Sequence, residues 1–436
     1  MQSRLHYIPV RLKFVFALIA ALAWAFLSYH LAERWIHDLS ELANFPVAVF
    51  VIFGIAILPG FMNAFLVVSL LLDRRPHYGE IKYWPGITIL IAAYNEEEGI
   101  LATLESIDKQ HYPGDLQVVV INDGSRDRTL ELLRSANYPW LNVLDLEHNA
   151  GKANALNRGL AMADHDLVLT LDGDSYLYSE ALCHLVGHYL RDPPNTAAVA
   201  GAMLVQNSRS SLVTEIQEWD YFHGIASIKR IQSLYQGTLV AQGAFSLYRK
   251  DVLSEVGGWP ECIGEDIVLT WAILDRGYRV GYCEDACAFT NVPTGWRQFI
   301  RQRQRWSRGL IEAFKAHWKL LLKPRMSTLF IWWNLLFPYL DAVYTLCFLP
   351  GLVLAVFGIY WIAGPMTLLV LPLAVIVNYL MFLVQSRMFI AQGLKVRRNP
   401  VGFIVYALLY SIILQPACLL GYLSEFFNIR KSWGTK

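Results

Sequence analysis

The sequence predicts an α/β domain with a mostly parallel sheet covered on both faces, set between two apolar ends that cross a membrane. Hydrophobic residues make up 55% of the 436 residues and charged residues only 17%, a balance typical of membrane proteins. The apolar stretches gather at the two ends, whereas short strand-like and helical segments alternate between them. We therefore expect an N-terminal membrane hairpin (1–79), a central cytosolic domain (80–323) and C-terminal interfacial and membrane helices (324–436).

Two apolar runs, 14–29 and 45–72, make up most of the N-terminal part. Two spans of about 20 residues each would return the chain to its starting side. Basic residues precede the first run, and Arg74 and Arg75 follow the second, which places both outer ends in the cytosol. This pattern favours a membrane hairpin over a cleavable signal peptide.

The C-terminal part contains three apolar stretches long enough to cross a membrane. They cover residues 341–361, 366–386 and 402–424. The aromatic segment 326–340 is expected either at the membrane interface or within a span, and Asp341 at the edge of a span. The basic loop 387–398 fits a cytosolic position, but three spans would put the basic tail 430–436 on the opposite side. The side of the tail therefore stays open.

Short apolar segments with strand character alternate with helical spacing in the central domain. The expected strands are 87–93, 116–122, 166–171 and 197–205. The expected helices are 97–110, 127–136 and 152–163. In a sheet of this kind ligands bind beyond the carboxyl ends of the strands, so the residues at those ends are the first candidates for a site.

Acidic residues follow three of the expected strands. Tyr94 and Glu96 come after the first, Asp123 after the second, and Asp172 and Asp174 after a later one. Turn chemistry explains any one of these strand ends, but three in one domain favour a ligand. Like charges at close range resist joint ionisation unless a cation compensates them. The aspartate pair therefore predicts Mg²⁺ or Mn²⁺ held against a nucleotide diphosphate.

Two helix starts carry further candidate side chains. HNAGKANALNRG brings Lys152 to a helix N-terminus, which suits a phosphate but equally suits a plain helix start. GGWPECIGEDIVLTW opens another helix with Glu265 and Asp266. The helix dipole alone accounts for acids in a first turn, and a general base is the functional alternative.

The stretch WRQFIRQRQRWSRGL, 296–310, holds five arginines within twelve residues. Read as a helix, it places Gln302, Arg305 and Trp306 on one face. A basic helix on anionic lipid is one interpretation. Arginine as the partner of a leaving diphosphate, with tryptophan offering a flat face to a sugar ring, is another, and both can hold.

Composition excludes two other classes. The net charge of +1 offers no electrostatic case for nucleic-acid binding. The six cysteines are scattered without a zinc-binding pattern, and in so large a chain we expect reduced thiols that serve packing.

Taken in order, AYNEEEG, INDGS, NAGKANALN, LDGDS, AQGAF, GEDIVLTW and QRQRW resemble the motifs of processive, membrane-embedded family 2 glycosyltransferases. This family includes synthases of cellulose, chitin, hyaluronan and poly-β-1,6-N-acetylglucosamine. The resemblance runs from about Pro85 to Gly309 and extends to the apolar layout of both ends. It implies a GT-A (Rossmann-like) fold and inverting transfer from a UDP-sugar donor to a growing polysaccharide acceptor. The layout is most similar to bacterial poly-β-1,6-N-acetylglucosamine synthases of the inner membrane, with UDP-GlcNAc as donor.

The resemblance also implies roles for matching residues on the donor side. The residues around the uridine would be Tyr94, Glu96, Asp123 and Lys152. The metal-binding Asp-x-Asp motif would be Asp172 and Asp174.

On the acceptor side, Asp266 would be the catalytic base, with Glu265 beside it. The diphosphate and the acceptor end of the chain would be bound by Gln302, Arg305 and Trp306. Gly243 and Ala244 would line the acceptor site. By the same analogy, any control by cyclic di-GMP would involve a small regulatory membrane subunit, and membrane lipid would surround the spans.

Three alternatives remain open at this point. The product could be another β-linked polymer, because these motifs do not encode sugar choice. The acceptor could be a lipid carrier, although a single transfer needs no exit path for polymer. A transporter or an idle scaffold is the non-enzymatic alternative, and a transporter should carry ionisable residues within its spans.

Overall fold

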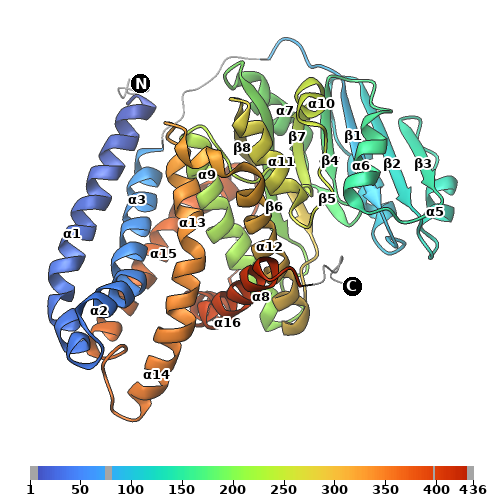
Figure 1. The fold of residues 1–436 in the computed structure, drawn as a ribbon. Coiled ribbons are helices and arrows are strands. Elements are labelled where there is room, and N and C mark those ends of the chain that lie inside the picture. Colours follow the sequence, from blue (N-terminus) through green and yellow to red (C-terminus); the bar gives the residue numbers. More distant parts are fainter. Residues whose placement is uncertain (1–7, 74–80, 396–397, 430–436) are drawn as a thin grey trace.

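The computed structural model describes residues 8–73, 81–395 and 398–429. Long helices stand on one side of the molecule and a sheet with its helices on the other, as Figure 1 shows. A layer of shorter helices and the long helix α12 (Trp296–His317) lies between the two parts.

Eight strands form one sheet in the order β3-β2-β1-β4-β7-β6-β8-β5. Their bounds are β1 Ile87–Ala93, β2 Leu116–Asp123, β3 Leu141–Leu146, β4 Leu167–Leu171, β5 Ser175–Leu177, β6 Thr196–Val205, β7 Phe245–Arg249 and β8 Arg279–Thr290. The four predicted strands are β1, β2, β4 and β6. The sheet is mostly parallel, as predicted: β1 pairs in parallel with β2 and β4, β2 with β3, and β6 with β8. Two strands run the other way, because β7 is antiparallel to both β4 and β6, and β5 is antiparallel to β8. Phe245 pairs with Leu171, so β7 enters the sheet at the carboxyl end of β4 and must run back along it.

Both faces of the sheet are covered, as predicted. The covering helices are α4 Ile100–Asp108, α5 Thr129–Ser135, α6 Lys152–Leu160, α7 Ala181–Arg191, α10 Lys250–Val256 and α11 Glu265–Asp275. Neighbouring residues of β1 belong to separate apolar clusters: Ile89 packs in the cluster with α4 and α7, and Leu90 in the cluster with α6 and α11. This alternation is the period-two pattern of a strand buried on both sides.

The parallel strands β1, β2 and β4 end at the same edge of the sheet. Ala93, the last residue of β1, pairs with Asn122 near the end of β2. On its other side β1 pairs with β4 in parallel, Ile87 opposite Leu167. The strand-end residues of the sequence motifs are therefore gathered at one edge, where open α/β sheets bind ligands.

Within the described residues, five helical segments are long and apolar enough to cross a membrane. They are α1 (Val10–Leu42), the run α2–η1–α3 (Phe45–Ile52, Phe53–Ile57, Leu58–Leu72), the run α13–η4–α14 (Thr328–Val343, Tyr344–Phe348, Leu349–Val356), α15 (Pro365–Ala391) and α16 (Pro400–Phe426). This makes the chain a membrane protein.

The third of these segments differs from the span expected at 341–361. It begins at Thr328, so the aromatic residues 326–340 belong mostly to the helix, and it ends at Val356 because Gly358 takes a positive φ of 79°. Asp341 is consequently well inside the segment and not at its edge. Its side chain is buried and accepts a hydrogen bond of 3.1 Å from the Tyr422 hydroxyl of α16.

The layer between the two parts consists of α8 (Leu212–Trp219), η2 (Asp220–Ile225), α9 (Ala226–Leu234), α12 and the short η3 (Trp318–Leu322). An ion-pair chain ties this layer to its neighbours. Arg230 of α9 lies 2.5 Å from Asp73, at the end of α3, and 2.6 Å from Glu284 of β8. One guanidinium thus connects the N-terminal helices to the sheet.

Candidate active site

The pair of aspartates follows directly after β4, as predicted. The Asp172 amide donates to the Ala244 carbonyl at 3.2 Å, and the Ser175 amide donates back to the Asp172 carbonyl at 3.1 Å. A Cβ placed on the intervening Gly173 would lie 3.2 Å from Cγ of Glu96. The AYNEEEG, LDGDS and AQGAF motifs therefore meet at this turn, although they are up to about 150 residues apart in the sequence.

Lys152, the first residue of α6, forms an ion pair with Asp172. Burial by itself would lower the pKa of Lys152, but the negative charges of Asp172, Glu265 and Asp266 raise that pKa above its ordinary value. A Cβ placed on Gly243 would lie 3.0 Å from Nζ of Lys152 and 3.9 Å from Oε1 of Glu265. Because Gly243 has no side chain, the lysine and the acids can lie close together at this point.

Glu265 and Asp266 form the first turn of α11. Burial, followed by the charge of Asp266, raises the pKa of Glu265 above its ordinary value, against the charges of Lys152 and Arg305. Neighbouring acids with unequal surroundings are a common arrangement for acid–base work. Three carboxylates thus act on one ammonium group. The cluster keeps a net negative charge, which attracts a further cation.

No group of three or more histidine, cysteine, aspartate or glutamate side chains has a metal-binding arrangement in the part of the chain that the structure describes. The carboxylate oxygens of Asp172 and Asp174 are nevertheless donors of the kind that Mg²⁺ and Mn²⁺ prefer. A cation, the ammonium group of Lys152, already binds Asp172. The two aspartates have the chemistry that a divalent ion needs, and their role as its ligands stays a prediction.

Helix α12 packs directly on the turn that carries the two acids. A Cβ on Gly264 would lie only 2.4 Å from Cα of Gly309, so two glycines allow the backbones to touch. Oε2 of Glu312, which is buried, accepts a hydrogen bond of 2.9 Å from the Gly264 amide. The position of Asp266 is thus coupled to the position of α12.

The Gln-x-x-Arg-Trp face of α12 is held by a buried ion pair that the sequence motifs did not indicate. The Arg303 guanidinium lies 2.9 Å from Asp220 of η2 and 4.1 Å from the centre of the Trp306 ring. The Tyr410 hydroxyl of α16 donates to the same aspartate at 2.8 Å. Trp306 itself remains 41% exposed, with its ring 6.4 Å from the ring of Tyr221.

The electrostatic surroundings of Tyr221 connect this face to the aspartates. Burial raises the pKa of Tyr221 to about 12, against the charges of Arg303 and Arg305, and Asp172 adds to the increase. Oε1 of Gln302 is buried without a hydrogen-bond partner within the described residues. Arg305 therefore belongs to the same electrostatic neighbourhood as Asp172, whereas Gln302 is placed only by its position on α12.

Lys229 and Gln242 were missed at the sequence level. Lys229 of α9 donates to the Gln242 side chain, which in turn donates to the Gly201 carbonyl at 2.6 Å. Burial lowers the pKa of Lys229 to about 8, although the charge of Asp266 opposes this. Gln242 belongs to the AQGAF motif and could have been flagged, whereas a lone lysine in α9 carries no sequence signal.

Asp123 and Tyr94 occupy less central positions than expected. Asp123 is the last residue of β2, and its two carboxylate oxygens accept hydrogen bonds of 2.9 Å from the amides of Ala150 and Gly151. It thereby anchors the loop that leads into Lys152. Tyr94 is 39% exposed just beyond β1. Their roles toward a uridine stay predictions.

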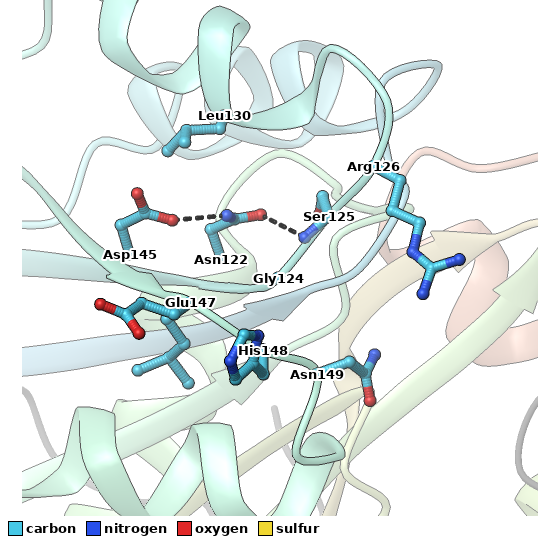
Figure 2. Close-up of a pocket in the computed structure, with 10 residues that line it drawn as sticks. Asn122, Gly124, Ser125, Arg126, Leu130, Asp145, Glu147, His148 and Asn149 are labelled. Carbon is cyan, nitrogen blue, oxygen red and sulfur yellow. Dashed lines mark hydrogen bonds between the residues drawn. The ribbon is translucent and has the colours of Figure 1, made fainter.

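A cavity of about 550 Å³ opens beyond the carboxyl ends of β2 and β3 (Figure 2). Its lining residues are Asn122, Gly124, Ser125, Arg126, Leu130, Asp145, Leu146, Glu147, His148 and Asn149. Asn122 donates to Asp145 at 2.7 Å and accepts from the Ser125 amide at 3.3 Å. The cavity flanks Asp123 along the chain, and Asn122, Gly124 and Ser125 of its lining belong to the INDGS motif, but it contains none of the individually named candidate site residues.

Comparison with known proteins identifies the central part. Residues 88–257 match the family model described as glycosyl transferase family 2. Residues 88–257 are a family 2 glycosyltransferase domain. This confirms the family that the motifs resemble, although Glu265, Asp266 and the α12 motif lie beyond the matched range.

Two staphylococcal relatives carry the same printed name, poly-beta-1,6-N-acetyl-D-glucosamine synthase. The protein of Staphylococcus aureus (strain COL) is 35% identical over 263 residues, 60% of this chain and 63% of the relative. That of Staphylococcus epidermidis is 33% identical over 276 residues, 62% of this chain and 65% of the relative. The chain thus spans just under two thirds of the length of these relatives.

A solved structure shows the same fold over the whole chain. The mannosyltransferase from Pyrobaculum calidifontis, in complex with GDP-Man and Mn²⁺, superposes with a TM-score of 0.54 at 18% identity. The match covers 97% of this chain and 100% of that one. The GT-A glycosyltransferase fold predicted for the central domain, flanked by apolar helices, is confirmed.

The glycine contact between α11 and α12 yields a first prediction. Replacing Gly309 with alanine puts a Cβ 2.8 Å from Cα of Gly264, closer than packed carbons come. Overpacking of this kind costs about 1–3 kcal/mol, so G309A should lower the melting temperature in detergent. Gly295→Ala, where a Cβ meets nothing within 4 Å, is the matched control and should melt like the unmodified protein. Equal melting of both variants would contradict the close contact.

Proposed function

We propose that this chain is an inverting, metal-dependent glycosyltransferase that adds N-acetylglucosamine from UDP-GlcNAc to a growing β-1,6-linked exopolysaccharide. The observation that carries the proposal is the cluster of Lys152 with three carboxylates at the carboxyl edge of the sheet, beside the exposed ring of Trp306. The name printed for the two staphylococcal relatives supports the choice of sugar and product.

On the donor side, Asp172 and Asp174 would hold Mg²⁺ or Mn²⁺, and Lys152 would exchange its contact with Asp172 for the diphosphate of the donor. When bound, the ion neutralises the charge that develops on the leaving UDP. A solved structure with the same fold is in complex with GDP-Man and Mn²⁺, which supports metal use in general. Arg305 is the guanidinium proposed for the diphosphate, because the neighbouring Arg303 is already paired with buried Asp220.

On the acceptor side, Asp266 would accept the proton of the attacking hydroxyl. A bond forms between that oxygen and the anomeric carbon while the bond from this carbon to the β-phosphate oxygen breaks, so a single in-line displacement inverts the configuration. Glu265, beside Asp266 in the first turn of α11, has a pKa that burial raises, so it holds a proton more readily than an exposed glutamate does.

Trp306 would stack on the sugar at the end of the acceptor, with Gln302 and the backbone of Gly243 and Ala244 completing the site. The Trp306 ring is exposed on one side and lies against Arg303 on another, so it has a fixed orientation. The apolar helices next to α12 would carry the product across the membrane. The basic residues around the first two apolar runs support a cytosolic position for the glycosyltransferase domain.

The donor assay tests this proposal. The protein is purified into nanodiscs and given UDP-GlcNAc, UDP-glucose or UDP-glucuronate with Mg²⁺ or Mn²⁺, and UDP release is measured. Polymer from UDP-GlcNAc alone that a β-1,6-specific glycosidase digests is the expected result. UDP release with another donor would mean that the product is a different polymer. A product attached to a lipid carrier without elongation would overturn processive synthesis.

The assignment of the base predicts the effect of Asp266→Asn. Loss of a general base typically costs a factor of about 10²–10⁴ in rate. UDP release should fall by that factor, while binding of UDP, measured by calorimetry with Mn²⁺ present, should change less than about twofold, because the asparagine keeps the shape of the side chain. Polymer synthesis by this variant at the rate of the unmodified protein would contradict the assignment of Asp266 as the base.

The metal assignment predicts a different pattern for Asp172→Asn. This variant should lose both UDP release and the Mn²⁺-dependent part of UDP binding, because one of the two proposed ligands is gone. Asp251→Asn, which changes an exposed acid paired with Arg249, is the control and should behave like the unmodified protein. Undiminished metal-dependent UDP binding in the Asp172 variant would exclude it as a ligand.

A further inference from the structure

Helix α16 is apolar enough to be a fifth span, yet its N-terminal end is attached to α8. The Asn399 side chain, which caps α16, donates to the Glu215 carbonyl at 3.0 Å and to the Glu218 carboxylate at 2.7 Å. The Trp219 indole donates to the Asn399 carbonyl at 2.9 Å. All three partners belong to α8, so α16 starts on the layer that covers the glycosyltransferase domain.

The C-terminal end of α16 is attached to the same layer. The Glu425 carboxylate lies 3.3 Å from Arg308 and 2.9 Å from Lys315, both on α12. Arg308 also donates to the Ile429 carbonyl at 2.7 Å. Of the five arginines near the Gln-x-x-Arg-Trp motif, this one is therefore buried in an ion pair and does not face lipid.

The middle of α16 follows α12 as well. The ring of Tyr410 lies 5.8 Å from that of Phe299, and a Cβ on Gly421 would lie 2.5 Å from the Gln304 carbonyl. Moving along α16 from Tyr410 to Glu425, its partners on α12 advance from Phe299 to Arg308. The two helices therefore run in the same general direction in close contact.

Both supporting helices are fastened to the sheet domain. The Ser211 hydroxyl that caps α8 donates to the Thr294 carbonyl at 2.8 Å, just after β8. At the other end of α12, His317 lies 3.8 Å from Asp275 of α11. A helix of 27 residues is about 40 Å long, so crossing a membrane would carry one of its ends away from this domain. Instead, both ends of α16 touch helices of the domain.

The direction of α16 differs from that of the other apolar helices. In Figure 1, α1, α3 and α13 are seen from the side, whereas α16 is seen strongly foreshortened next to α8 and α12. The side of α16 that faces away from α12 is apolar and exposed. Its exposed residues are Val401, Ile404, Leu409, Leu420, Leu423 and Phe426. Two exposed arginines of α12, Arg297 and Arg301, lie near the start of the shared interface.

We infer that α16 lies in the plane of the membrane surface, at the level where its Tyr422 contacts Asp341 of α13, with its exposed apolar side in lipid, and does not span the bilayer. Lipid is the occupant that fits, because the exposed side chains of α16 are aliphatic or aromatic and the helix contacts the span α13 through Tyr422 and Asp341. The chain then crosses the membrane four times, through α1, α2–α3, α13–α14 and α15. An even number of crossings puts the basic tail 430–436 on the same side as the glycosyltransferase domain. A basic tail on this side agrees with the positive-inside rule, whereas three C-terminal spans would put the tail on the opposite side.

Depth measurement on α16 tests the inference without any transferase assay. Leu409 and Leu420 are both exposed and lie 11 residues apart, which puts them about 16 Å apart on nearly the same side of the helix. Each is replaced by a spin-labelled cysteine in a chain whose six native cysteines are alanine, in nanodiscs of phosphatidylethanolamine and phosphatidylglycerol. Depth is read from the accessibility of the label to oxygen and to a water-soluble nickel complex.

Phe16 and Leu27 of α1, also exposed and 11 residues apart, are the matched control pair. The α1 labels should differ in depth by about 15 Å, and the α16 labels should lie at the same depth within a few ångström. A depth difference on α16 as large as that on α1 would overturn the inference. A second arm adds an epitope tag after Lys436 of the full chain. Protease should remove the tag only in inside-out vesicles, and removal in right-side-out vesicles would equally overturn the inference.

Discussion

The structure depends on one electrostatic constraint, the gathering of Asp172, Glu265 and Asp266 around the ammonium group of Lys152. Burying several like charges is costly unless cations and hydrogen bonds compensate them. Because β4, α6 and α11 meet at one edge of the sheet and Gly243 leaves room between them, the lysine compensates part of this charge. The remaining negative charge attracts a cation, and in the proposed function that cation binds the diphosphate.

Helix α12 connects this charged cluster to the membrane part. Gly309 on one of its faces touches the turn that carries Glu265 and Asp266. Arg303 is buried against Asp220, and Arg308 against Glu425. Removing one partner of a buried pair generally costs about 3–5 kcal/mol because the other charge is left unpaired, so the loss of either arginine would leave a buried carboxylate uncompensated. In the proposed reaction the acceptor would lie where α12 meets both the acids and the apolar helices, which joins sugar transfer to passage through the membrane.

Much of the fold follows from local sequence patterns, and the misses have physical causes. The strands β1, β2, β4 and β6 are apolar runs that read directly as buried strands. β5 has only three residues, β3 is partly exposed, and β8 is interrupted by Glu284 and Asp285, so none of them carries such a signal. The antiparallel direction of β7 depends on where the preceding helices return the chain, which no local pattern encodes.

The sequence by itself determined the kinds of chemistry available: the order of the acidic strand ends, the lysine and acids at two helix starts, and the glutamine, arginine and tryptophan on one helix face. Only the tertiary structure decided which charges meet. Lys152 pairs with Asp172, Asp123 accepts hydrogen bonds from backbone amides, and α16 lies along α12. These pairings join residues from about 20 to more than 100 positions apart. Their energies depend on burial and distance, which arise only when the chain has folded.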